Sequence, residues 1–406
     1  MNELPWSEAA AVAAPKENDA MAASPFQSFL MAGFECSSHR RFDDKRVDMV
    51  AATRHDEFAL RDYARLCEWG IRTSRDGLRW HLIESSPRTY DFTSVAAQLD
   101  AAQSVGVQVI WDLFHYGYPD GLDIFARDFP DRFADFAAAF GQFHLSQTGR
   151  APSVVPVNEI SFFSWIAGEK GRFYPHSAGR ADELKIQLVR AALAARSAIH
   201  DVCPGARFVL SEPAVYVKAR PEDAYNAEGA EHYRLSQYQT LDMLTGRLAP
   251  ELGGRADYID VIGVNYYPHN QWYYPDREMI PLGADDYRPF HLILAEIYER
   301  YRIPIIVSET GAEGMERVPW YRYIRAECET AITMGVDLQG ICLYPILNHP
   351  GWDDERHCPN GLWGFSDDSG NRPVYEPLLT EIQSAAILGR QPATSPSSRH
   401  WLSCRP

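Results

Sequence analysis

PIIVSETG, at residues 304–311, begins with apolar, mostly β-branched residues and ends abruptly in polar ones. A short continuous run rich in Val and Ile is typical of a strand that is buried on both faces, as in a parallel sheet. The polar residues Ser308, Glu309 and Thr310 then stand at the carboxyl end of that strand. We therefore predict a buried strand that carries a carboxylate, Glu309, at its carboxyl end.

Seven similar runs are spread along the chain and alternate with helical periodicity. The clearest helical pattern is a stripe of phenylalanines from Phe129 to Phe143, at steps of four and three residues, which we interpret as helix packing. Eight strand and helix units in about 360 residues allow about 45 residues each, which suits a barrel with long loops. We predict an α/β fold, a single (β/α)8 TIM barrel with extended βα-loops. The other predicted strands are FLMAGFE (29–35), IRTSRDGLRW (71–80), VQVIWDLFHY (107–116), VVPVNEI (154–160), RFVLSEPA (207–214), YIDVIGVNYY (258–267) and LQGICLYPIL (338–347).

A doubly wound open sheet is the competing architecture. Such a sheet usually carries a Gly-rich phosphate-binding turn after its first strand, whereas the corresponding segment here reads GFECSSHRR (33–41). Neither GxGxxG nor GxxxxGKS/T occurs in the sequence. The barrel is therefore favoured.

The composition argues against several classes of partner. With 39 Lys+Arg against 55 Asp+Glu, the formal net charge is −16, which makes nucleic acids and anionic membranes poor partners. No run of about 18 apolar residues indicates a transmembrane helix. Scattered cysteines without a metal-binding spacing suggest reduced thiols in a cytoplasmic protein. We expect a flexible leader at 1–25, the barrel at 26–387 and a flexible tail at 388–406.

Polar groups at the carboxyl ends of barrel strands face the active site. Two of them, Glu159 and Glu309, are carboxylates that follow apolar runs and should lie across the mouth of the barrel. Cleavage of a glycosidic bond requires one acid to protonate the leaving oxygen and one carboxylate at the anomeric carbon. The other polar groups near predicted strand ends are Arg72, Arg75, Arg79, Asp112, His115, Asn158, Glu212, Asn265, Tyr267, Tyr344, Asn348 and His349.

The order and spelling of four of these segments resemble glycoside hydrolase family 1, the β-glucosidase family of retaining (β/α)8 glycosidases. The segments are VPVNE, SETG after a β-branched run, IRTSRDGLRW and DVIGVNYY, and the resemblance runs through most of residues 26–385. It implies that Glu159 is the acid/base and Glu309 the nucleophile. It further implies that Asn158 binds the sugar 2-hydroxyl, that Arg72 and Tyr267 hold the nucleophile, and that His115 and Asn265 line the sugar subsite.

The chain also departs from the family pattern at two places. The usual Gln near the first strand is replaced in its neighbourhood by Glu35 and Cys36. The strand-8 loop has Tyr344 where the family has a Trp, and it has no Glu before Trp352. We expect Tyr344, Asn348 and Trp352 to contact substrate, and we expect a divergent branch whose sugar is not given by the resemblance.

Other groups allow more than one interpretation. Glu212 is either a competing acid or a supporting residue, and Arg75 belongs either to the site or to its support. A zinc site is one interpretation of a group of His, Asp and Cys residues near the C-terminal end of the barrel, but their spacing fits a solvated loop better. That group is His349, Asp353, Asp354, His357 and Cys358, and loop aromatics suited to sugar stacking are Trp165, Phe173, Tyr174, Trp272, Tyr273, Tyr274, Trp352 and Trp363.

The sequence thus predicts a retaining β-glycosidase that acts by double displacement on small unphosphorylated glycosides. We expect no cofactor and no metal, a small-molecule glycoside as partner, and no nucleic acid or membrane. Two alternatives remain open, namely a transglycosylase that uses the same carboxylates and a non-catalytic sugar-binding barrel. The sequence does not indicate the oligomeric state.

Overall fold

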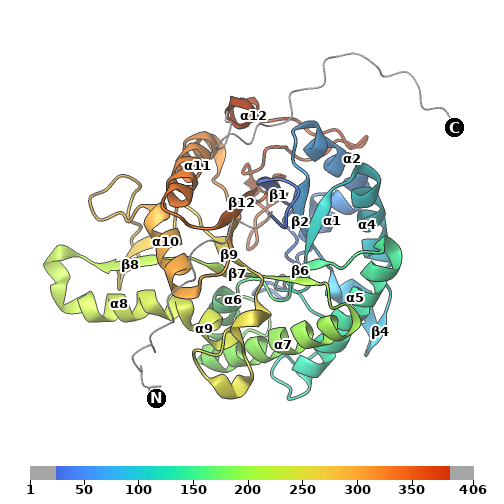
Figure 1. Ribbon diagram of the computed structural model, residues 1–406, viewed down its shortest axis with the longest axis horizontal. Coiled ribbons are helices and arrows are strands. Elements are labelled where there is room, and N and C mark those ends of the chain that lie inside the picture. The colour runs from blue at the N-terminus through green and yellow to red at the C-terminus, as the bar shows by residue number, and fades with distance from the viewer. Residues whose placement is uncertain (1–23, 385–406) are drawn as a thin grey trace.

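A computed structural model describes residues 24–384 and shows a closed barrel of eight parallel strands (Figure 1). The predicted (β/α)8 barrel is therefore confirmed. The leader at 1–25, apart from residues 24 and 25, and the tail at 388–406 lie outside the described residues. In the order in which neighbours pair, the strands are β1 (Leu30–Gly33), β12 (Leu338–Leu343), β11 (Ile305–Thr310), β9 (Val261–Asn265), β7 (Arg207–Pro213), β6 (Ser153–Val155), β5 (Gln108–Asp112) and β2 (Thr73–Gly77).

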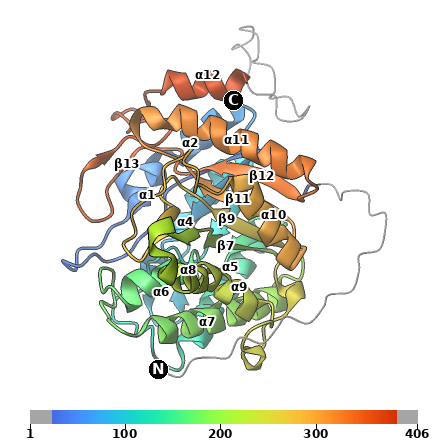
Figure 2. The same cartoon turned by 90° about the vertical axis from the view of Figure 1, so that its left-hand side faces the viewer.

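Helices surround the barrel, with α7 on one side and α11 and α12 on the opposite side in both views (Figures 1 and 2). The longer helices are α2 (His55–Glu68), α4 (Thr93–Val105), α5 (Phe129–Thr148), α7 (Ala181–Val202), α10 (Phe290–Tyr301) and α11 (Arg317–Thr333). The shorter ones are α1 (Met49–Ala52), α3 (Trp80–Ile83), α6 (Ile160–Gly168), α8 (Ala227–Leu235), α9 (Gln239–Leu244) and α12 (Glu376–Ser384).

Three two-stranded sheets lie in the loops outside the barrel. The pair β8 and β10 packs with α8 into an extension on the left of Figure 1. The small strands are β3 (Glu84–Ser86), β4 (Thr89–Tyr90), β8 (Tyr216–Ala219), β10 (Gln271–Tyr274), β13 (His349–Pro350) and β14 (His357–Cys358).

The phenylalanine stripe lies in α5, where it packs as predicted. Phe129, Phe133, Phe136 and Phe140 are at most 1% exposed, and Phe143 at the end of the stripe is partly buried. Burial of each such ring contributes on the order of 1.5–3 kcal/mol. Phe140 also contacts Trp111 of β5, with the ring centres 6.0 Å apart, so the helix packs against the barrel wall there.

Alternation along the strands separates the barrel interior from the helix layer. One apolar side chain from nearly every strand fills the interior. These side chains form a cluster of Met31, Ile110, Val155, Val209, Val261, Ile306 and Cys342, together with Phe26 and Tyr344. On β2 the same alternation points Arg75 into the barrel and Asp76 toward the helix layer. Only residues that point into the barrel can reach a group at the centre of its carboxyl-terminal end.

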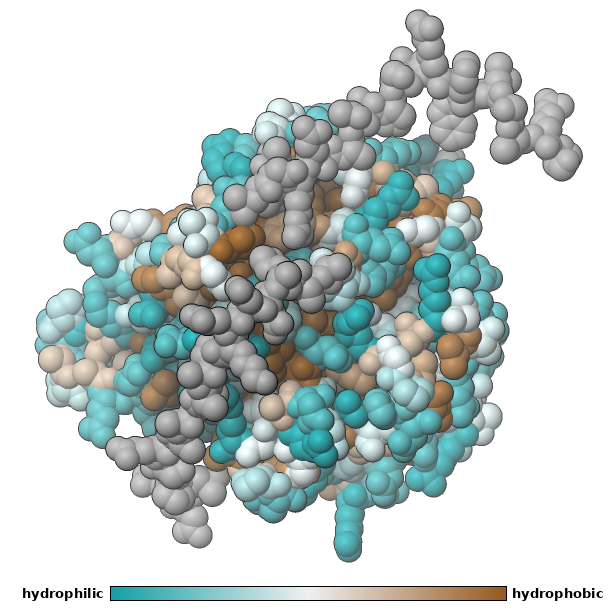
Figure 3. Space-filling model, viewed as in Figure 1, coloured by the Kyte–Doolittle hydropathy of each residue, from teal (hydrophilic) through white to brown (hydrophobic). Residues whose placement is uncertain are grey.

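No helix within residues 24–384 combines the length and the apolarity that a membrane crossing needs. The face seen in Figure 3 is mostly hydrophilic around its edge, and hydrophobic side chains show mainly toward its middle.

Candidate active site

A cavity of about 890 Å³ opens at the carboxyl ends of the barrel strands. Glu309, at the end of β11, and Glu159, in the segment that follows β6, both line it. Side chains at the carboxyl ends of barrel strands converge in this way because parallel strands end at the same edge. The two carboxylates predicted from the sequence therefore share one cavity.

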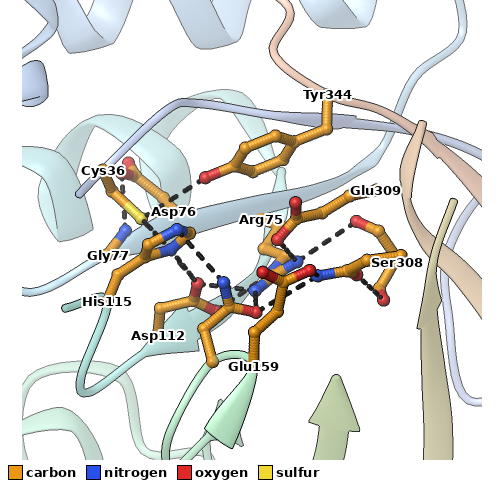
Figure 4. A network of polar contacts seen from close by, with 12 residues as sticks. Cys36, Arg75, Asp76, Gly77, Asp112, His115, Glu159, Ser308, Glu309 and Tyr344 are labelled. Carbon is orange, nitrogen blue, oxygen red and sulfur yellow. Dashed lines mark hydrogen bonds and ion pairs between the residues drawn. The ribbon is translucent and has the colours of Figure 1, made fainter. Parts of the chain in front are cut away.

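Glu309, on β11, is held by a buried arginine and a tyrosine. Arg75 Nη1 donates to Glu309 Oε1 at 2.7 Å, and the Tyr267 hydroxyl donates to Oε2 at 2.9 Å. Arg75 is itself fixed by Asp112, which accepts from its Nε at 2.9 Å and from its Nη2 at 2.7 Å (Figure 4). Such a bidentate pair holds the guanidinium plane rigidly, so Glu309 has a defined orientation.

Glu159 lies in the turn between β6 and α6, not in a strand. Its backbone has φ 47° and ψ 60°, the left-handed region that residues other than Gly and Asn seldom occupy. The Tyr116 hydroxyl donates to its Oε2 at 2.6 Å, and Asn265 Nδ2 donates to its Oε1 at 2.9 Å. Strained backbone at a cavity-lining acid is typical of functional sites, where the surrounding contacts hold the conformation.

Asn158 and His115 connect the two carboxylates through one hydrogen-bond network. Asn158 Oδ1 accepts from Arg75 Nη2 at 2.7 Å, while Asn158 Nδ2 lies 3.1 Å from His115 Nε2 and 3.2 Å from the Tyr116 hydroxyl. His115 Nδ1 lies 2.8 Å from Asp112 Oδ2. If Nδ1 carries the proton, Nε2 is free to accept from Asn158.

Three residues expected to contact substrate lie behind the cavity wall instead. Asn158, His115 and Asn265 are at most 2% exposed and are not among the side chains that line the cavity. Their polar atoms bind other site residues. In this structure they position Glu159 and Arg75, and their contact with a sugar stays a prediction.

The expectation that Arg72 holds the nucleophile is wrong. Arg72 precedes β2, its side chain is exposed, and its Nη1 donates to the Val105 carbonyl at 3.2 Å. Side chains on a strand alternate, and the residue that reaches Glu309 is Arg75, three positions further along. Residues separated by an odd number of positions lie on opposite faces of a strand. Arg72 therefore lies on the other face from Arg75, and it also lies before the first residue of β2.

The three substrate residues predicted after strand 8 divide in the structure. Tyr344 and Trp352 line the cavity, and the guanidinium of Arg75 lies 5.4 Å from the centre of the Tyr344 ring. Asn348 does not line the cavity, and its contact with substrate stays a prediction. Its Oδ1 accepts from the Gly361 backbone at 2.8 Å, so its amide stabilises the loop.

The two catalytic candidates differ in their electrostatic surroundings. Burial and the nearby Glu309 charge raise the pKa of Glu159 to about 8. Burial also raises the pKa of Glu309, but Arg75, His115 and the Tyr267 hydrogen bond oppose this rise. At neutral pH the arrangement favours a protonated Glu159 beside an ionised Glu309.

Glu212 has a supporting position. Its carboxylate accepts from the Ser161 backbone N–H at 3.2 Å, at the start of α6 and next to Glu159. Burial raises the pKa of Glu212 to about 7. It does not line the cavity, so the structure places it as a support for the Glu159 turn.

The residues considered as a zinc site after strand 8 do not form a cluster of converging ligand atoms within residues 24–384. Asp353 pairs with Arg172, and the ring nitrogens of His349 contact Pro350 O and Asn360. Within residues 24–384, the one group whose ligand atoms converge is Cys36, Asp112 and His115, all within 4.8 Å of one another. Both Asp112 oxygens already bind Arg75, so a cation there would have to displace that guanidinium.

Aromatic side chains form part of the cavity wall. Among the predicted stacking residues, Trp165, Trp272 and Trp352 line the cavity, together with Phe162. The other predicted stacking residues, which do not line it, are Phe173, Tyr174, Tyr273, Tyr274 and Trp363.

Sequence reasoning missed Tyr116, and it left the role of Arg75 open. Tyr116 follows β5 in a left-handed conformation, φ 66°, that turns its hydroxyl toward Glu159. Periodicity carries no signal for such a turn, because alternation ends with the strand. Strand alternation could have identified Arg75. It lies two residues from both Thr73 and Gly77, so these three residues share the inward face of β2.

The fold and the site define an α/β barrel with two buried carboxylates in a cavity at the carboxyl ends of its strands. No protein-family model and no curated protein sequence matches the chain. Among solved structures it is similar to the family 1 β-glucosidase from Thermotoga maritima, with a TM-score of 0.68 and 15% identity over 87% of this chain and 96% of that chain.

Ligand complexes of β-glucosidase from the same organism give similar values. The complex with isofagomine lactam has a TM-score of 0.68 and 16% identity, over 89% of this chain and 98% of that one. The complex with cyclophellitol has a TM-score of 0.67 and 15% identity, over the same shares of the two chains. At this level of identity the similarity shows the fold.

Proposed function

We propose that the protein is a retaining β-glycosidase of the family 1 type, a divergent branch, that hydrolyses small unphosphorylated glycosides. Glu309 is the nucleophile and Glu159 the acid/base. The observation that carries this proposal is the contrast between two carboxylates in one cavity. Glu309 is paired with Arg75, whereas the hydrogen-bond partners of the Glu159 carboxyl group within residues 24–384 are neutral and its pKa is about 8.

In the first step Glu309 attacks the anomeric carbon while Glu159 protonates the departing oxygen. The ester that forms removes the Glu309 charge. Because that charge helps to raise the pKa of Glu159, its loss lowers the pKa again. Glu159 is then suited to take a proton from the water that releases the sugar.

The surrounding residues support this division of labour. Tyr116 and Asn265 hold the two Glu159 oxygens, and Arg75 and Tyr267 hold those of Glu309. The similar solved structures include β-glucosidase from Thermotoga maritima in complex with glucoimidazole and with deoxynojirimycin, which supports a small glycoside as ligand. A cytoplasmic location stays a prediction from the scattered cysteines.

Azide rescue of two variants tests the assignment. Glu159→Ala and Glu309→Ala should each lower turnover of an unactivated glycoside, for Glu159 by about 10²–10⁴-fold. With a nitrophenyl glycoside, azide should attack the glycosyl-enzyme of Glu159→Ala and give the β-glycosyl azide. In Glu309→Ala, azide should replace the nucleophile and give the α-azide, and proton NMR distinguishes the two.

The wild-type enzyme provides the matching stereochemical control, because its first product should retain the β configuration. An inverted first product, or the same azide anomer from both variants, would contradict the roles. Full activity of both variants together with an inactive Glu212→Gln would move the chemistry to Glu212.

A further inference from the structure

A third carboxylate, Glu35, lines the same cavity but has no part in the mechanism above. It follows β1, two residues after Gly33, and its side chain is only 4% exposed. Glu35 Oε1 accepts from the Ser37 backbone N–H at 2.9 Å. No other hydrogen bond and no ion pair of Glu35 is found within residues 24–384.

The cations near Glu35 are committed to other groups. Arg75 binds Asp112, Glu309 and Asn158, and the Nδ1 atom of His115 lies against Asp112. Two further basic side chains, Lys185 and Arg277, line the cavity, and their hydrogen bonds go to neutral partners. Lys185 Nζ donates to Gln239 at 2.8 Å, and Arg277 Nη2 donates to the Tyr233 hydroxyl at 2.5 Å.

A buried carboxylate with a single hydrogen bond is unusual, because an ionised carboxylate has about four acceptor positions and burial without partners is costly. The remaining acceptor positions of the Glu35 carboxylate therefore require hydrogen-bond donors. A ligand in the cavity can supply these donors, because Glu35 lines the cavity. The charge of Glu35 also reaches the nucleophile: after burial, it is among the groups that raise the pKa of Glu309.

We propose that Glu35 is a specificity-determining residue that accepts hydrogen bonds from hydroxyl groups of the sugar and selects against sugars that carry a carboxylate or phosphate. The inference rests on the proposed glycosidase function and adds the charge of the preferred sugar. Hydroxyl groups supply the missing donors. An anionic group at the same place would lie near both Glu35 and Glu309, and the cation beside them, Arg75, already binds Glu309 and Asp112.

Two substitutions separate charge from hydrogen bonding. Glu35→Gln keeps the size and an oxygen for the Ser37 N–H but removes the charge, whereas Glu35→Ala removes the acceptor altogether. On a nitrophenyl β-glucoside, Glu35→Ala should lower kcat/KM by about 10–100-fold, the effect of losing hydrogen bonds to a charged group. Glu228→Gln, which removes the same charge from an exposed position on α8, is the matched control and should leave kcat/KM unchanged.

A series of monodeoxy glucosides then locates the contact. The wild type should lose activity on the glycoside that lacks the bound hydroxyl, and Glu35→Ala should lose nothing further on that substrate. Equal losses in both proteins at every position would overturn the contact, because independent effects add.

The effect of the Glu35 charge is tested by comparing kcat/KM for a neutral sugar, nitrophenyl β-glucoside, with kcat/KM for an anionic sugar, nitrophenyl β-glucuronide. The wild type should prefer the neutral sugar, and Glu35→Gln should reduce that preference by about tenfold or more, because like charges in a partly dry site repel strongly. A preference that is the same in both proteins would overturn the selectivity proposal.

Calorimetric binding of uncharged isofagomine lactam separates the two proposals. Lactam binding that depends on Glu35, in a protein that hydrolyses no glycoside, would support Glu35 and contradict the glycosidase function. Hydrolysis that is the same with and without Glu35 would contradict the Glu35 proposal alone. Absence of both hydrolysis and lactam binding would overturn both, and thermal unfolding of each variant checks that it is folded.

Discussion

Two buried ionic networks lie on opposite faces of β2. Two consecutive residues of the strand, Arg75 and Asp76, belong to different networks. Arg75 points into the barrel toward Glu309, whereas Asp76 points outward and binds His55 Nε2 at 3.0 Å and the Tyr63 hydroxyl at 2.6 Å. Figure 4 shows Arg75 and Asp76 next to each other on this strand. Both networks are buried, so burial and charge alone do not identify a functional site.

The networks differ in whether every acceptor is satisfied inside the protein. On the outer face, His55 lies between Asp62 and Asp76, and both Asp62 oxygens also accept from Arg372. Although burial opposes the charged ring, Asp76 and Asp62 raise the pKa of His55 to about 9. On the inner face, Glu159, Glu309 and Glu35 face a cavity. A closed network contributes to stability, whereas one that faces a cavity is available to a ligand.

The largest expected effect tests the closed network. Arg372→Met leaves Asp62 buried with less positive charge around it, so the free energy of unfolding should fall by about 3–5 kcal/mol. Because this network does not reach the cavity, kcat/KM below the unfolding transition should stay unchanged. Urea denaturation and steady-state kinetics measure the two quantities.

Arg322→Met is the matched control, since Arg322 pairs with Glu381 from a side chain that is 60% exposed. Its stability should change by about 0–1 kcal/mol. If Arg372→Met instead lowered kcat/KM at full stability, the division between the two faces of β2 would fail.

The second prediction concerns pH and tests the network that faces the cavity. Glu159 must be protonated to act as an acid, and burial together with the Glu309 charge sets its pKa at about 8. Activity should therefore be lost as pH rises, with kcat/KM falling about tenfold per pH unit above this value. The pH dependence of kcat/KM for an unactivated glycoside measures it.

Two comparisons sharpen this pH test. Removing the charge of Glu212 with Glu212→Gln should move the alkaline limb to lower pH, because that charge adds to the raised pKa of Glu159. In Glu159→Ala the limb should disappear. An unchanged alkaline limb in Glu159→Ala would show that a different group titrates.

The comparison also shows what the sequence could predict. Apolar runs located all eight strands, and the ends of these runs placed Glu159 and Glu309 at one rim, because parallel strands in a barrel share their carboxyl end. Residues in turns were not predictable in the same way. Tyr116 and Glu159 both have left-handed backbones, and Asn348 turns into its loop, so strand periodicity gives no direction for their side chains.

The smallest expected effect tests the alternation on β2 itself. The Arg72 side chain is exposed and donates to the Val105 carbonyl at 3.2 Å, so Arg72→Ala should change the free energy of unfolding by no more than about 0.5 kcal/mol and leave kcat/KM unaltered. Arg75→Ala removes the same kind of side chain from the inward face. It leaves Asp112 and Glu309 buried without their cation, and kcat/KM should fall by at least about a hundredfold. Thermal unfolding and kinetics of the two variants, measured side by side, check this. A hundredfold loss in Arg72→Ala with an active Arg75→Ala would mean that β2 is shifted by an odd number of residues, and Asp76 would then face the cavity.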